Sequence, residues 1–104
     1  MWSHIQNLTG RTLKTLDRGN AFDIVSVGSA TATVRPLASG IDRTIEREAF
    51  EQAFTELRTR GELSRTDIQK KYSSFNPAYV ASMLAQVPGV SVKTRPIRLF
   101  YRKP

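Results

Sequence analysis

The sequence predicts an α+β fold, in which an N-terminal three-stranded antiparallel meander packs on three helices and a C-terminal β-hairpin. Residues 22–45 contain short runs rich in β-branched and aromatic residues, separated by turn signals. Residues 47–87 carry apolar side chains at helical spacing, and residues 90–102 alternate apolar and polar side chains. The chain of 104 residues has the size of one domain, so we expect a single domain over 1–104. Its β-rich part is 1–46 and its helix-rich part is 47–104.

The N-terminal part begins with a segment that we expect to form a short amphipathic helix over residues 3–9, with Ser3 as its N-cap. Residues 11–16 are ambiguous, and a turn follows at Asp17–Asn20, where Gly and Asn tolerate positive φ. The strands of the meander are expected over residues 22–27, 31–36 and 43–45.

The most strongly patterned element is a helix over residues 47–60. Its apolar side chains fall on one face, and acidic residues lie near its start. Arg58 and Arg60 lie near its end, where positive charge interacts favourably with the helix dipole. Gly61 can adopt the left-handed conformation that commonly ends a helix.

Two further helices are predicted from their start signals. Ser64 and Asp67 have the spacing of a capping box before a helix of about two turns that ends near Tyr72. Asn76 followed by Pro77 suits the N-cap and first position of a third helix, which we expect to continue to Val87.

The chain then turns at Pro88-Gly89 and forms a hairpin. Its strands are joined by a tight connection at residues 93–96. Alternation places Ile97, Leu99 and Tyr101 on one face of the second strand, and Arg98, Phe100 and Arg102 on the other.

Positive charge is concentrated in the C-terminal part of the chain. The formal net charge is +7, and residues 62–104 contain eight Lys or Arg against two Asp or Glu. Such an asymmetry indicates an acidic partner, of which nucleic acid is the commonest, although a basic surface also serves solubility.

Several function classes lack sequence support. The chain contains no cysteine, and His4 is its one histidine, so the residues of thiolate, metal and acid–base sites are scarce. No phosphate-binding glycine loop or carboxylate cluster of nuclease type is present, and we expect no enzyme activity, no cofactor and no metal. No apolar run reaches the roughly 20 residues of a membrane span, and the first residues do not resemble a secretory signal, so we expect a cytoplasmic protein with no membrane partner.

The predicted order over residues 47–102 is helix, extended link, helix, three-residue turn, helix and hairpin, and it resembles a winged helix-turn-helix domain. The link is Gly61–Ser64 and the turn is Ser73–Phe75, whereas residues 1–46 have no counterpart in that family. The resemblance implies that the third helix enters the major groove of DNA and that the hairpin, called the wing, contacts the backbone or minor groove. By resemblance, the reading face would be Asn76, Tyr79, Ser82 and Gln86, and the wing residues would be Lys93, Arg95 and Arg98.

The residue types support a DNA-binding role for the wing more strongly than for the third helix. Clustered Lys and Arg on a hairpin neutralise phosphates, and Lys70 and Lys71 could extend that surface. The third helix contains no Lys or Arg, so the bidentate contact of Arg with guanine is not available to it. Its small residues Ala78, Ala81 and Ala85 instead permit close approach of DNA, the N-terminal sheet or a partner protein.

Aromatic residues near the predicted helix ends and on the hairpin have two interpretations. They are Tyr72, Phe75, Tyr79, Phe100 and Tyr101. Stacking on the bases of single-stranded nucleic acid is one interpretation, and burial in the core is the one that the spacing favours. Phe100 is the best candidate for stacking, because it shares a strand face with Arg98 and Arg102.

We therefore predict non-enzymatic binding of double-stranded DNA through the basic hairpin. The predicted nucleic-acid-binding residues are Lys70, Lys71, Tyr79, Ser82, Gln86, Lys93, Arg95, Arg98 and Arg102. The alternative is a protein-interaction module that docks on an acidic partner, such as an accessory factor of a nucleic-acid machine or a phage or mobile-element inhibitor.

Overall fold

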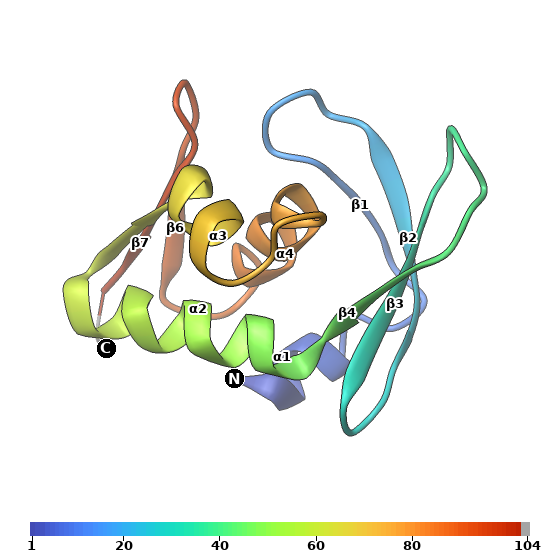
Figure 1. Ribbon diagram of the computed structural model, residues 1–104, viewed down its shortest axis with the longest axis horizontal. Coiled ribbons are helices and arrows are strands. Elements are labelled where there is room, and N and C mark those ends of the chain that lie inside the picture. The colour runs from blue at the N-terminus through green and yellow to red at the C-terminus, as the bar shows by residue number, and fades with distance from the viewer. Residues whose placement is uncertain (103–104) are drawn as a thin grey trace.

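Two antiparallel sheets flank a pair of helices in the computed structural model, which describes residues 1–102 (Figure 1). The first sheet contains the four strands β1 to β4, and the second contains β5, β6 and β7. Helices α3 (Arg65–Lys71) and α4 (Pro77–Leu84) lie between the sheets, and α2 (Arg47–Arg60) runs along one side, from the last strand of the first sheet to the first strand of the second (Figure 1). The predicted α+β class is confirmed.

The first sheet has one strand more than the sequence predicts. Its order is β1-β2-β3-β4, and every neighbouring pair is antiparallel. The elements of the N-terminal part are α1 (Trp2–Gln6), β1 (Thr12–Lys14), β2 (Ala21–Val27), β3 (Thr31–Pro36) and β4 (Arg43–Glu46). The additional strand β1 buries only Leu13 between two exposed neighbours, so its alternation is too short to be recognised in the sequence.

The C-terminal part contains α2 (Arg47–Arg60), β5 (Glu62–Ser64), α3 (Arg65–Lys71), α4 (Pro77–Leu84), β6 (Val90–Lys93) and β7 (Arg98–Tyr101). The second sheet has the order β5-β7-β6, so the link expected to be merely extended adds a third strand to the hairpin. Pairing of Ser64 with Arg98 brings the start of α3 next to the hairpin.

The helix ends confirm most of the predicted signals. Gly61 follows α2 with φ at 83°, and Ser64 and Asp67 form the expected capping box. Pro77 occupies the start of α4, but the Asn76 side chain makes no capping bond, because its Oδ1 accepts from Arg43 at 3.3 Å. Both ends of α1 and the end of α4 differ from expectation: α1 covers Trp2–Gln6 instead of residues 3–9, and α4 ends at Leu84 instead of Val87.

One continuous cluster of buried hydrophobic side chains joins the two parts of the chain. Trp2 packs against Phe50 of α2 with ring centroids 5.5 Å apart. Phe22 of β2 meets Tyr79 of α4 edge-on at 4.9 Å. Six of the eight residues of α4 are buried. The third helix is therefore an internal element packed between the two sheets.

Candidate nucleic-acid interface

Two adjoining cavities lie where the β1–β2 loop, the start of α3 and the β6–β7 loop approach one another. Both loops project toward the same end of the molecule, at the top of the view in Figure 1. The cavities have volumes of about 580 and about 450 Å³, and both are lined by Asp17 and Arg65. We call them together the arginine groove, which is defined by Arg18, Arg43, Arg65, Arg95 and Arg98.

Arg65 lies at the centre of the groove, because it lines both cavities. Its backbone N–H donates to the carbonyl of Ile97 at 3.2 Å, which fixes the start of α3 against the hairpin. Its Nε lies 3.7 Å from Asp17 Oδ2 and is buried without a hydrogen-bond partner within the described chain. A buried guanidinium N–H without an acceptor is costly, and the nearby Asp17 carboxylate offsets part of this cost.

The hairpin contributes Arg95 and Arg98 to the groove. Arg95 is exposed in the β6–β7 loop. Arg98 is the first residue of β7 and pairs with Lys93 across the hairpin. Its Nη1 lies 3.3 Å from Glu62 Oε1, so a carboxylate of β5 partly neutralises it. Arg95 is the less compensated charge of the two.

Arg18 is carried by a loop that its own hydrogen bonds hold together. The buried Thr15 hydroxyl accepts from the Asn20 amide at 3.0 Å, and Asp17 Oδ1 accepts from the Arg18 amide at 2.8 Å. Partial burial opposes ionisation of Asp17, but backbone hydrogen bonds and attraction to Arg65 lower the pKa of its carboxyl. The groove therefore contains one ionised carboxylate among its five guanidinium groups.

Arg43 approaches from β4 and contacts the first turn of α4. Its guanidinium lies 5.7 Å from the ring centroid of Tyr79, within the range of a cation–π interaction. Phe75 and Asn76 line the same cavity from the α3–α4 turn. Aromatic and cationic groups thus surround this part of the groove.

The structure brings only some of the predicted basic residues together. Arg95 and Arg98 line the groove, and Lys93 is exposed at the end of β6. Lys70 and Lys71 lie at the opposite end of α3 from Arg65. Lys71 Nζ is 3.1 Å from Glu56 Oε1 of α2, so this lysine is committed to an ion pair within the protein.

The predicted reading face of the third helix is largely inaccessible. Ser82 is 2% exposed, and its hydroxyl donates to the Ala78 carbonyl at 2.8 Å. Tyr79 lines the groove but packs on Phe22, and Gln86 is exposed beyond the end of α4. The Ser82 side chain is covered because α4 packs against α2, α3 and strand β1.

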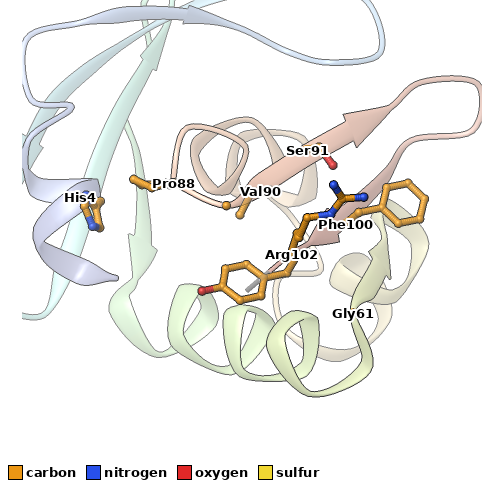
Figure 2. A pocket seen from close by; sticks show the side chains of 9 residues that line it. His4, Gly61, Pro88, Val90, Ser91, Phe100 and Arg102 are labelled. Carbon is orange, nitrogen blue, oxygen red and sulfur yellow. The ribbon is translucent and has the colours of Figure 1, made fainter. Parts of the chain in front are cut away.

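Arg102 lies in a different place from the other hairpin arginines. It lines a cavity of about 920 Å³ at the base of the hairpin, together with Phe100 and His4. Figure 2 shows His4 entering from α1 on one side of this cavity and Phe100 on the other. Phe100 and Arg102 are therefore separated from the arginine groove, which Arg98 lines.

Sequence reasoning missed Arg18, Arg43 and Arg65. All three lie outside the predicted hairpin, and two belong to the part of the chain that is nearly neutral overall. Arg65 lies beside the hairpin because β5, which directly precedes α3, pairs with β7, a pairing that the sequence did not predict. No local signal exists for Arg18 or Arg43.

Residues 1–102 were also searched for metal sites and for membrane-spanning helices. That part of the chain has no cluster of three or more His, Cys, Asp or Glu side chains placed to hold a metal ion. None of its helices combines the length and apolar character needed to cross a membrane. In comparisons with known proteins, the chain matches no protein-family model, no curated protein and no solved structure.

Proposed function

We propose that this protein binds the phosphate backbone of double-stranded DNA through the arginine groove. The observation that carries the proposal is the convergence of five guanidinium groups, from both parts of the chain, on cavities that contain one lining carboxylate. Guanidinium groups bind phosphate oxygens in a bidentate manner, and their neutralisation of phosphates releases counterions. These features support an anionic polymer as the ligand.

The arrangement of residues 47–102 supports a winged-helix unit as the scaffold of this interface. Helix α2, strand β5, helices α3 and α4 and the β6–β7 hairpin follow in the order that the resemblance predicts. In this proposal the hairpin is the wing, and the starts of α3 and α4 face the DNA. The N-terminal sheet is an addition that supplies Arg18 and Arg43 to the same face.

Recognition of the DNA backbone is favoured over recognition of bases. Phosphate contacts position a protein without reading sequence, whereas base contacts need side chains that reach into a groove. The middle of α4 is buried against α2, α3 and strand β1, and only its first turn lines the arginine groove. We therefore propose low sequence selectivity, with DNA shape as the main source of any preference.

Replacing Arg95 by alanine tests the proposal. We expect weaker binding to a generic DNA duplex and a slope of log affinity against log salt that is smaller by about 1, because one phosphate contact is lost. Fluorescence anisotropy of a labelled duplex at several salt concentrations measures both quantities. Arg58→Ala is the matched control, since Arg58 is exposed on α2 and does not line the groove.

Three results would contradict the proposal. Undetectable binding of the wild-type protein to duplex DNA at low salt would exclude it. Equal weakening by Arg58→Ala and Arg95→Ala would mean that overall charge, and not the groove, determines binding. Tighter binding to poly-glutamate than to DNA would instead favour the acidic protein partner.

A further inference from the structure

Phe75 is an aromatic side chain that the fold leaves in solvent. It lies in the turn between α3 and α4 and is 85% exposed, more than any other large apolar side chain in residues 1–102. A single exposed apolar residue needs no special explanation. Phe75, however, lines the same cavity as Arg18, Arg43 and Arg65. The exposed ring therefore lies beside three of the five arginines of the groove.

This combination fits an unpaired nucleotide better than a base-paired one. A base that is stacked within a duplex does not offer its face to a side chain, whereas an unpaired base can stack on an aromatic ring. The neighbouring guanidinium groups can bind the phosphates on either side of that base. The cavity volume of about 450 Å³ falls within the range of about 300–1,000 Å³ that is usual for small-ligand sites.

We propose that the cavity between Phe75 and the three arginines binds one unpaired nucleotide at the end of a DNA duplex, with the base stacked on Phe75. This inference rests on the proposed duplex binding and extends it. The duplex backbone lies along Arg95 and Arg98, and the first unpaired nucleotide reaches the cavity lined by Arg18, Arg43 and Arg65. The preferred partner is then a duplex with a single-stranded tail.

The test compares a blunt duplex with duplexes that carry a short 5′ or 3′ single-stranded tail, by fluorescence anisotropy at constant salt. We expect one tailed form to bind about tenfold more tightly than the blunt form, as stacking of one base on an aromatic ring allows. Phe75→Ala should remove this difference, so that blunt and tailed duplexes bind with equal affinity. Phe75→Trp should preserve the difference, and Arg95→Ala should weaken all probes alike.

Leu37→Ala is the matched control, because Leu37 is also exposed (54%) but lies in the β3–β4 loop and lines neither cavity of the groove. Phe75 makes little contact with the core, so its replacement should leave the far-UV circular dichroism unchanged. Equal affinity of the wild-type protein for blunt and tailed duplexes would overturn the nucleotide site alone. Equal weakening of all probes by Phe75→Ala would also overturn it. Absence of binding to every probe would overturn the duplex proposal together with this one.

Discussion

Replacing Phe22 by alanine is expected to lower the free energy of unfolding by about 3–5 kcal/mol, the usual cost of removing a fully buried phenylalanine. Phe22 is 0% exposed and contacts Tyr79 edge-on with ring centroids 4.9 Å apart. It lies on β2 and Tyr79 lies on α4, so the substitution opens a cavity between the N-terminal sheet and the helices. Urea denaturation followed by circular dichroism measures the loss.

The same experiment tests whether the two parts of the chain unfold together. Trp2 is the single tryptophan and reports on the contact of α1 with α2, whereas circular dichroism mainly reports on the helices as a whole. We expect coincident transitions with both probes, since one cluster of buried side chains joins the two parts. Val25→Ala, at a position 38% exposed on the same strand, should cost less than about 1 kcal/mol. A similar loss for both variants, or two separate transitions, would contradict the shared core.

Replacing Glu56 by glutamine is expected to lower the free energy of unfolding at neutral pH by about 2 kcal/mol. The Glu56 carboxylate accepts hydrogen bonds from the Tyr72 hydroxyl, from Arg60 at 2.6 Å and from Lys71 at 3.1 Å. These contacts lower the pKa of Glu56 from 4.5 to about 2, with the Tyr72 hydroxyl as the largest cause. Because the Arg60 and Lys71 side chains are nearly half exposed, solvent screening keeps the loss below the value that the full shift implies.

The direction of the pH dependence follows from the lowered pKa. A carboxyl that is more acidic in the folded state stabilises the protein above the pKa of the unfolded chain. We therefore expect stability to fall as the pH decreases from about 4.5 toward 2 in the wild-type protein, and to fall less in Glu56→Gln. The same hydrogen bond raises the pKa of Tyr72 from 10.0 to about 12, so its contribution is lost as the pH rises through that interval.

Glu51→Gln is the control for Glu56→Gln. Glu51 pairs with Arg47 one helical turn away at 2.6 Å, but both side chains are more than 40% exposed. Exposed pairs of this spacing contribute only about 0.3–0.5 kcal/mol. Thermal denaturation across the acid range compares the variants, and identical acid profiles for Glu56→Gln and the wild-type protein would exclude this role of Glu56.

Local sequence determined the elements whose signals lie within a few residues of one another. The helix over residues 47–60 has the predicted bounds, because an apolar face and Gly61 are encoded within one segment. The capping box of Ser64 and Asp67 and the start of α4 at Pro77 follow for the same reason. The α+β class also follows, since alternation in strands and helical spacing are periodic along the chain.

The tertiary structure decided which of these elements meet, and hence the composition of the arginine groove. Arg18 and Arg43 reach Arg65 through packing of the N-terminal sheet, which no spacing along the chain encodes. Tertiary packing also buries the middle of α4. The ion pair of Lys71 with Glu56 likewise keeps this lysine from binding an external anion. Net charge follows from the composition, and periodicity follows from residues close together in the sequence. Burial and ion pairing, in contrast, depend on residues that are distant in the chain. The sequence by itself thus indicated a basic α+β protein, and only the folded arrangement determined which basic side chains share one face.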